Sequence, residues 1–271
     1  MTDTHTHLYM ADAYPDGCVQ AVERAIAAGV THLVFPGVDM DSQTPMRELH
    51  ERFPHNTHIA LGLHPTELGE NWEETLDRME AMLPGDFSAI GEVGIDLYHD
   101  SLMRAEQKKA LARQLGWARQ YGLPVIIHCR EGLDDTIDII KESGDDLPPL
   151  IFHSFTGTVD DVRRIREVCD PWFGINGVVT FKNAPLLREA LPEIGIDRIL
   201  LETDSPWLSP APRRGERNES ARIPLIRDCV AATLGITAEE VEKTTDRSAA
   251  RLFGFTDIPI AGSPGPVSAT P

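Results

Sequence analysis

Histidines and carboxylates recur at the ends of short apolar runs in this chain. Imidazole and carboxylate groups are common ligands of divalent transition metals. Burying four histidines and two carboxylates together without a cation would cost on the order of several kcal/mol each. The sequence therefore predicts a metal centre. Its candidate ligands are His5, His7, Glu92, His128, His153 and Asp204.

Six ligands are more than one catalytic ion uses while keeping an open coordination position, so we expect two divalent ions. The ions expected are zinc, magnesium or manganese. A carboxylate can bridge two ions about 3.5–4 Å apart, an arrangement that stabilises both the attacking and the leaving oxygen of a hydrolysis. Glu92 lies in the fourth of the apolar runs described below and is predicted to be the bridge.

The segments between these residues indicate the elements that position them. Eight short, mostly β-branched runs alternate with segments of helical periodicity, which predicts parallel strands joined by helical crossovers. The predicted strands are 3–8, 31–38, 58–64, 88–96, 124–129, 149–155, 172–180 and 198–205. Predicted helices include 17–28, 72–83, 104–121, 133–141, 159–168, 221–234, 237–244 and 247–253.

Eight such units predict a single-domain α/β fold, a (β/α)8 TIM barrel over residues 1–257. An open, doubly wound parallel sheet is the alternative, but the G-x-G-x-x-G loop expected after its first strand is absent. Barrel enzymes place their sites at the carboxyl ends of the strands, where the candidate ligands fall. Residues 258–271 are rich in glycine, proline and small residues and are predicted to be a disordered tail.

The composition is that of an acidic globular protein. Its 271 residues include 25 Lys and Arg and 43 Asp and Glu, a net charge of −18. Nucleic acids and membranes are anionic, so this charge argues against broad coating of either but allows a local cationic site. Neither a membrane span nor a secretory signal is found, so we expect a cytoplasmic protein without membrane contact or an obligate protein partner. The four cysteines are scattered and are expected to be core residues.

Seven short motifs carry a resemblance to a known family. They are His5-Thr6-His7, Gly62-Leu63-His64-Pro65, Gly91-Glu92-Val93-Gly94-Ile95-Asp96, His128-Cys129-Arg130, His153-Ser154-Phe155-Thr156-Gly157, Glu202-Thr203-Asp204-Ser205-Pro206 and Arg217-Asn218-Glu219. In this order and spacing, from Thr2 to about Phe255, the chain resembles the TatD-type metal-dependent deoxyribonucleases of the amidohydrolase superfamily. The resemblance implies a (β/α)8 barrel that hydrolyses DNA phosphodiester bonds with a metal-activated water.

The resemblance also implies how the ligands divide between the two ions. The first ion would be held by His5, His7, Glu92 and Asp204, and the second by Glu92, His128 and His153. Asp204 is implied to accept the proton of the attacking water. Glu92 and His64 are the other predicted catalytic residues.

Three residues are predicted to bind the substrate. His64, Arg130 and Arg217 are candidates for contacting phosphate oxygens, the arginines because their planar fork matches two of these oxygens at once. Each has a plainer explanation. His64 could be a structural residue beside Pro65, and the arginines could pair with nearby carboxylates.

The expected substrate is DNA at strand ends or in single strands. Two divalent ions would add a local charge of up to +4, while the acidic remainder of the surface disfavours wrapping a long duplex. One segment departs from the family pattern, which usually reads Gly-Lys-Arg-Asn-Glu-Pro: residues 215–220 have Glu216 in place of the lysine and Ser220 in place of the proline. The acid weakens the case for phosphate binding there, although Arg213 and Arg214 precede it and could compensate.

Two other functions fit the same ligands. A small-molecule metallohydrolase acting on a cyclic amide or lactone would use the same superfamily architecture. The arginines near residue 217 argue against it, because a neutral amide does not need them. A non-enzymatic, metal-stabilised barrel that binds nucleic acid or a protein would unfold without metal and turn over no substrate.

Overall fold

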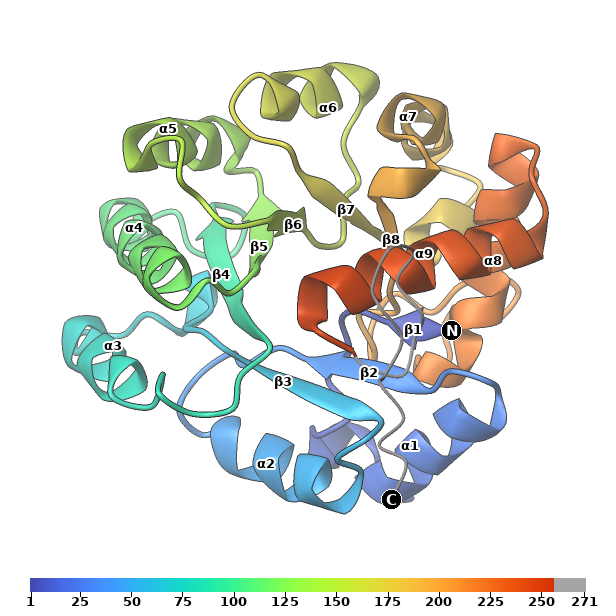
Figure 1. The fold of residues 1–271 in the computed structure, drawn as a ribbon, viewed down its shortest axis with the longest axis horizontal. Helices are drawn as coiled ribbons and strands as arrows, with labels where there is room; N and C mark the ends of the chain where they lie inside the picture. The colour runs from blue at the N-terminus through green and yellow to red at the C-terminus, as the bar shows by residue number, and fades with distance from the viewer. Residues whose placement is uncertain (256–271) are drawn as a thin grey trace, which may run out of the picture.

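The computed structural model describes residues 1–255, which form a ring of eight parallel strands surrounded by helices (Figure 1). The strands follow one another around the ring in chain order. They are β1 (Thr2–Asp3), β2 (His32–Phe35), β3 (Thr57–Leu61), β4 (Ala89–Asp96), β5 (Val125–Arg130), β6 (Leu150–Phe152), β7 (Trp172–Ile175) and β8 (Ile199–Leu201). The predicted TIM barrel is confirmed and the doubly wound sheet is excluded. The predicted tail at 258–271 lies outside the described residues.

The ring closes between β8 and β1 through backbone hydrogen bonds. The Thr4 amide donates to the Leu201 carbonyl at 3.0 Å, and the Asp204 amide donates to the His5 carbonyl at 2.9 Å. Thr6 also forms an isolated parallel bridge with Ser205. These bonds join the first and last segments of the barrel, which carry three of the candidate ligands.

The helices pack around the ring and bury one apolar stripe against it. They are α1 (Cys18–Ala27), α2 (Gln43–Arg52), α3 (Trp72–Glu80), α4 (Arg104–Tyr121), α5 (Leu133–Ser143), α6 (Val159–Arg166), α7 (Pro185–Ile194), α8 (Ile223–Leu234) and α9 (Ala238–Phe253). The predicted break between 244 and 247 is wrong. The helix continues through Thr245, whose hydroxyl donates to the Val241 carbonyl one turn earlier instead of ending the helix.

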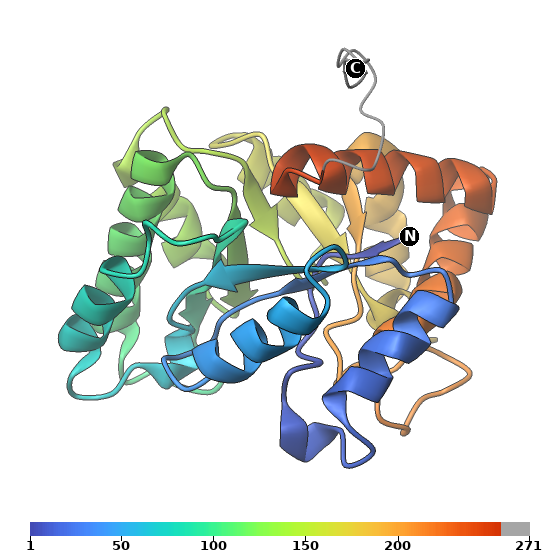
Figure 2. The ribbon, with the colours of Figure 1, turned by 60° about the horizontal axis from the view of Figure 1, so that its bottom comes forward.

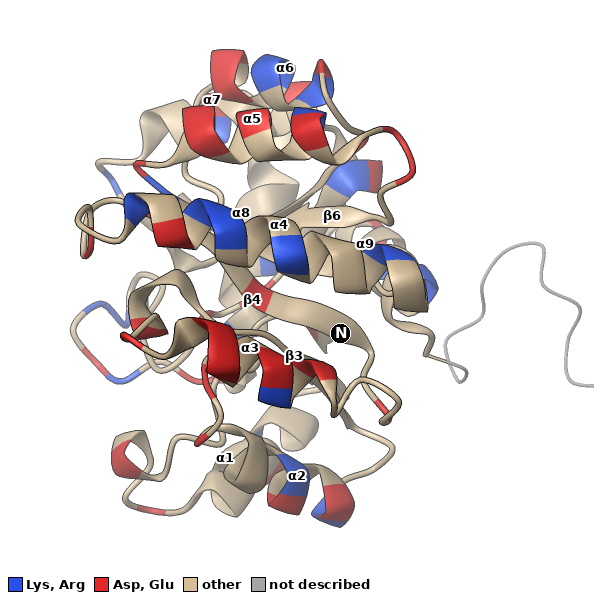
Figure 3. Cartoon of the chain, turned by 90° about the vertical axis from the view of Figure 1, so that its left-hand side faces the viewer, with Lys and Arg blue, Asp and Glu red and all other residues tan. Residues whose placement is uncertain are grey.

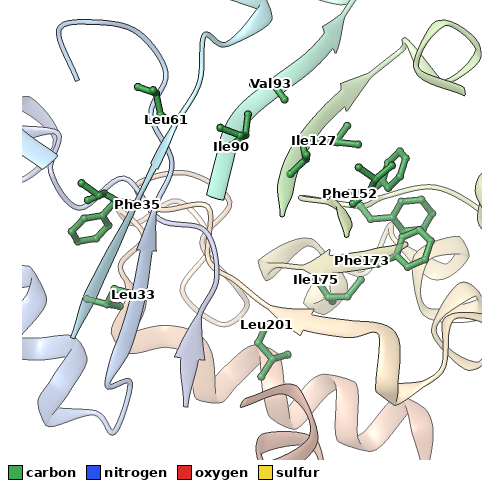
Figure 4. Packing of buried hydrophobic residues seen from close by; sticks show 14 of the residues in the cluster. Leu33, Phe35, Leu61, Ile90, Val93, Ile127, Phe152, Phe173, Ile175 and Leu201 are labelled. Atoms are coloured by element: carbon green, nitrogen blue, oxygen red, sulfur yellow. The ribbon is translucent and has the colours of Figure 1, made fainter. Parts of the chain in front are cut away.

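Alternation along the strands separates two apolar layers. Leu33 and Phe35 of β2 lie in the outer layer, which the helices cover, as Figure 4 shows for the labelled strand residues. Val34, between them, belongs to the inner layer. Successive side chains of a strand point to opposite faces, so each strand supplies both layers.

The inner layer closes one end of the barrel against α9. Seven strands contribute to it, together with the second half of that helix and Phe255, two residues beyond the end of the helix. Its members are Val34, Ala60, Ala89, Ile126, Ile151, Trp172, Leu200, Ala249, Ala250, Leu252, Phe253 and Phe255. Figure 2 shows α9 lying across this end of the strands. This apolar floor leaves the opposite, carboxyl end of the barrel for polar residues.

Six of the eight strands end earlier than predicted at the carboxyl end, whereas β4 ends at Asp96 as predicted and β5 one residue later, at Arg130. β1 stops at Asp3 and β8 at Leu201, whereas the predicted strands extend to residues 8 and 205. Ser154 after β6 and Asp204 after β8 have φ angles of 48° and 55°, which regular extended pairing does not allow. The candidate ligands therefore lie mostly just beyond the strands. Among residues 1–255, every helix is too short or too polar to span a lipid bilayer.

Replacing Phe253 with alanine tests the contribution of the floor. This ring is 5% exposed, and removing it leaves a cavity between α9 and the strands. We expect Phe253→Ala to lower the free energy of unfolding by about 3–5 kcal/mol, measured by urea denaturation. Leu186→Ala, at a side chain that is 55% exposed on α7, is the control and should change it by less than about 0.5 kcal/mol. Equal effects of the two variants would contradict a floor formed by α9.

Candidate metal centre

The inner face of the strands changes from apolar to polar toward the carboxyl end. On β5, Ile126 belongs to the floor and His128 follows two residues later on the same face. After β8, Leu200 of the floor is followed in the same way by Glu202 and Asp204. A strand with a period of two thus places its polar residues directly above its floor residue. Several strands do this side by side, so their polar groups converge.

Glu92 lies at the centre of this convergence. It belongs to β4, whose pairing with β5 shifts register between Ile90 and Val93, and its amide donates to the Gly37 carbonyl at 2.7 Å. The side chain is buried, and its two carboxylate oxygens face different groups of imidazoles. This is the position expected for a carboxylate that bridges two ions.

The first group of ligand atoms surrounds Glu92 Oε2. His5 Nε2 lies 3.2 Å from both this oxygen and His7 Nε2. Asp204 Oδ1 is 3.7 Å from each of the two Nε2 atoms, and His7 Nε2 is 3.8 Å from Glu92 Oε2. Ligands at 2.0–2.1 Å from a tetrahedral ion are about 3.3 Å apart, so these four atoms fit a divalent cation.

The second group surrounds Glu92 Oε1. His128 Nδ1 lies 2.8 Å from this oxygen, His153 Nε2 lies 2.6 Å from it, and the two nitrogens are 3.4 Å apart. His64 Nε2 is also 3.4 Å from it. Two imidazole nitrogens and a carboxylate oxygen form a donor set for a second cation. The structure thus brings all six predicted ligands together in two groups that share Glu92.

The electrostatics of the first group also fit a cation. Burial lowers the pKa of His5 to about 4 and that of His7 well below its usual range, so both imidazoles are neutral and able to bind metal. Burial, together with the neighbouring Glu92, raises the pKa of Asp204 to about 8. A carboxylate in such a place needs a nearby cation to be ionised at neutral pH.

Hydrogen bonds behind two of the ligands fix which nitrogen faces the centre. His7 donates from Nδ1 to the Tyr9 hydroxyl at 2.8 Å, and that hydroxyl donates to the Pro36 carbonyl at 2.6 Å. His128 donates from Nε2 to the Asp96 carboxylate at 2.9 Å. Burial alone would raise the pKa of Asp96, but hydrogen bonds from His128 and from the His99 backbone amide hold it well below its usual range. Both arrangements leave the opposite imidazole nitrogen free for metal.

Glu202 lies beneath both groups. Its Oε1 accepts a hydrogen bond from the Ser154 amide at 2.5 Å and is 3.7 Å from His153 Nδ1. Among the described residues, its Oε2, His153 Nδ1 and His5 Nδ1 are buried without a hydrogen-bond partner. Gly174 makes room for this carboxylate, because a β-carbon there would lie 2.0 Å from Oε2. Glu202 therefore faces one imidazole of each group from the interior side.

His64 reaches the centre beside the second group. The Thr66 hydroxyl and amide lie 2.7 and 3.2 Å from its Nδ1, and its Nε2 is 3.4 Å from Glu92 Oε1. The contacts with Thr66 orient the ring so that Nε2 faces the centre, where it is available to a metal ion or to a phosphate oxygen.

The two predicted arginines differ in their surroundings. Arg130 is exposed at the end of β5, with its guanidinium 4.1 Å over the Tyr98 ring, and none of the described carboxylates pairs with it. Arg217 pairs with Asp16 at 2.8 Å and lies 4.8 Å over the Tyr14 ring. No contact among the described residues joins it to the ligand groups, and its phosphate contact stays a prediction.

The two departures from the family pattern take part in local contacts. Glu216 pairs with Arg222 at 2.9 Å and with Arg213 at 3.4 Å. The Ser220 hydroxyl donates to the Thr6 hydroxyl at 3.1 Å in the interior. The acid at position 216 thus engages one of the arginines that were expected to compensate for it.

Sequence reasoning did not assign roles to Tyr9, Asp96 or Glu202. Each lies an even number of residues from a ligand on the same segment: Tyr9 after His7, Asp96 after Glu92, and Glu202 before Asp204. The period of two was therefore a usable signal for residues that support the ligands.

A TIM barrel whose mouth holds carboxylates and imidazoles in two joined donor groups is the framework of a metal-dependent hydrolase of the amidohydrolase type. Comparison with known families agrees, because residues 2–254 match the TatD related DNase family. The chain belongs to this family.

Individual relatives cover nearly the whole chain. It is 34% identical over 252 residues to YabD of Bacillus subtilis, an uncharacterized metal-dependent hydrolase, covering 93% of this chain and 98% of that protein. It is 35% identical over 240 residues to the 3'-5' ssDNA/RNA exonuclease TatD of Cronobacter sakazakii, covering 86% and 90%. The crystal structure of YjjV, a TatD homologue from Escherichia coli, superposes with a TM-score of 0.85 at 26% identity, covering 94% and 98%.

Variants of the supporting residues test the division into two groups. Tyr9→Phe removes the acceptor of His7, and Asp96→Asn weakens the acceptor of His128. We expect each to reduce metal affinity about 10- to 100-fold in its own group only, because such partners orient the ligand. Competition with a chelator, followed by metal counting, measures both sites. Loss of the same ion in both variants would contradict the two groups.

Proposed function

We propose that this protein hydrolyses phosphodiester bonds of DNA, at strand ends or in single strands, with two divalent ions in the centre. The observation that supports this most directly is the division of the Glu92 oxygens between two groups of ligand atoms. When bound, zinc, magnesium or manganese ions would activate a water and neutralise the phosphate. His5, His7, Glu92 and Asp204 would hold the first ion, and Glu92, His128 and His153 would hold the second.

Asp204 is proposed to take the proton of the attacking water. Its Oδ1 is 3.7 Å from the Nε2 atoms of His5 and His7, so it lies at the edge of the first group. Its side chain is 14% exposed, whereas that of Glu92 is 5% exposed, so Asp204 is the more accessible of the two carboxylates. A carboxylate with this access can move a proton between substrate and solvent.

His64 and Arg130 are proposed to hold the phosphate. His64 Nε2 lies 3.4 Å from Glu92 Oε1 beside the second group, within reach of a phosphate oxygen bound at the centre. Arg130 follows His128 by two residues, and its charge is not engaged by any described carboxylate. In a chain with a net charge of −18, an unpaired arginine at the barrel mouth favours an anionic substrate.

The surrounding surface supports a local rather than an extended nucleic-acid contact. Acidic side chains lie on outer helices such as α3 (Figure 3). A long duplex would bring many phosphates close to such helices, which costs electrostatic energy. A short single-stranded segment or a strand end can reach the centre without this cost. The relative from Cronobacter sakazakii, named an exonuclease of single-stranded DNA and RNA, supports the same choice.

The test is cleavage of end-labelled single- and double-stranded oligonucleotides by the purified protein, before and after chelation. We expect cleavage that requires a divalent ion, is restored by adding zinc, magnesium or manganese, and favours single strands. A panel of cyclic amides and lactones is assayed in parallel. Turnover of an amide or lactone without cleavage of DNA would contradict the proposal.

Asp204→Asn separates the proton acceptor from the ligands of the second ion. We expect it to lower kcat by roughly 10² or more, the usual contribution of a general base, while the ion bound by His128 and His153 is retained. His128→Ala should instead lose activity that a high metal concentration partly restores. Activity and metal content of both variants, measured over a range of metal concentrations, check this. The same response of both variants to added metal would remove the distinction.

A further inference from the structure

We propose that Trp207 and Tyr98 are stacking sites for two unpaired nucleobases, one on each side of the metal centre. The inference rests on the proposed function and adds a part of the substrate that the metal ligands do not contact. Trp207 follows β8 and Tyr98 follows β4. With the strands in chain order around the ring, these two strands are on opposite sides of the barrel.

Trp207 is held at the rim beside the first group of ligand atoms. Its ring is 50% exposed and lies 5.3 Å from the ring of His7, at an angle of 71°. Its backbone is fixed on both sides: the amide donates to the Asp204 carbonyl at 3.0 Å, and the Asn218 side chain donates to the Trp207 carbonyl at 2.7 Å. The indole is therefore positioned by the chain but half open to solvent.

Tyr98 has an equivalent position beside the second group. Its ring is 57% exposed, and its amide donates to Asp96 Oδ1 at 3.0 Å. Asp96 in turn accepts the hydrogen bond of the ligand His128. The guanidinium of Arg130 lies over the Tyr98 ring. Because guanidinium N–H groups point outward in its plane, Arg130 can hold a phosphate while Tyr98 contacts the adjacent base.

Exposed aromatic rings are uncommon in this chain, whose aromatic content is 6%. Among residues 1–255, the large apolar side chains that are exposed are Tyr98, Leu102, Tyr121, Leu186 and Trp207. Of the exposed rings, Trp207 contacts the predicted ligand His7 directly, and Tyr98 is connected to the predicted ligand His128 through Asp96. Exposure of apolar rings has a cost in water that stacking on a ligand removes.

Nucleobases fit these rings better than other groups of a phosphodiester substrate. Every base has an aromatic face, so stacking is strong without selecting a sequence. Stacking also does not depend on a positively charged surface, which this acidic protein lacks. The bases of a duplex already stack on one another, whereas those of a single strand are free. The two rings thus give a physical reason for a preference for single strands.

The test compares a short single-stranded DNA oligomer with the same oligomer made wholly of abasic residues. Trp207→Ala and Tyr98→Ala should each raise KM for the intact oligomer about 5- to 150-fold, the equivalent of about 1–3 kcal/mol per stacked base. KM for the abasic oligomer should stay at the wild-type value. Trp207→Phe and Tyr98→Phe keep a ring and should retain most of the affinity.

Matched controls separate stacking from structural damage. Tyr121→Ala changes an exposed tyrosine at the end of α4, which runs back from the mouth, and should leave KM unchanged for both oligomers. Metal content and melting temperature of each variant should equal those of the wild type. Single abasic residues placed on either side of the cleaved bond should identify which base each ring contacts.

Three results would overturn the inference. Equal KM values of the wild type for intact and abasic oligomers would show that bases are not bound. Equal losses on both oligomers in the alanine variants would show that the rings act on the centre itself. In these two cases the proposed nuclease function stands. Failure of the wild type to cleave either oligomer with any divalent ion would instead contradict the proposed function, and the stacking sites with it.

Discussion

The buried carboxylate of Glu92 is the constraint on which the rest of the site depends. Its side chain is 5% exposed, and its two oxygens are contacted by five imidazoles from four different segments of the barrel. Burying an ion costs several kcal/mol. To balance the charge, these segments must therefore place their imidazoles at the same level along the barrel axis as the carboxylate. The hydrogen bonds that close the ring between β8 and β1 bring His5, His7 and Asp204 to one side of it. A change in the register of β1, β3, β5 or β6 would displace an imidazole that contacts this carboxylate.

The sequence predicted the barrel and brought the six candidate ligands to one end of it, because both inferences follow from local patterns. Side chains of a strand alternate between its two faces. His128 follows Ile126 by two residues and therefore lies on the same face, which located the centre at the carboxyl end. What could not be predicted depends on contacts between distant segments. Asp16 engages Arg217 only because the loops after β1 and β8 are neighbours in the closed ring. Likewise, the continuity of α9 depends on packing against the floor, which no local signal near Thr245 indicates.

Stability and chemistry are carried by opposite ends of the same strands. The floor residues are apolar and contact α9. Two residues further along a strand, the same face carries buried ionisable groups. Only one strand period separates them, so the floor also supports the ligand histidines from below. Glu202 lies between the floor and the ligand groups. Its buried carboxylate makes the interior side of the centre polar, and this side stays closed to solvent. Selection for activity can therefore act on the rim loops while the floor is kept.

The place of α9 in the chain has a consequence for how the protein is made. It is the last helix of the described residues, yet Ala249, Leu252 and Phe253 pack against side chains from seven strands that precede it. During synthesis the earlier strands emerge from the ribosome before the helix that covers them, so their apolar inner faces stay exposed until α9 has been synthesised. A nascent barrel of this kind is a natural client for chaperones that shield apolar surface. A premature stop codon shortly before position 249 would keep all six predicted ligands in the chain but remove the part of the floor that α9 contributes.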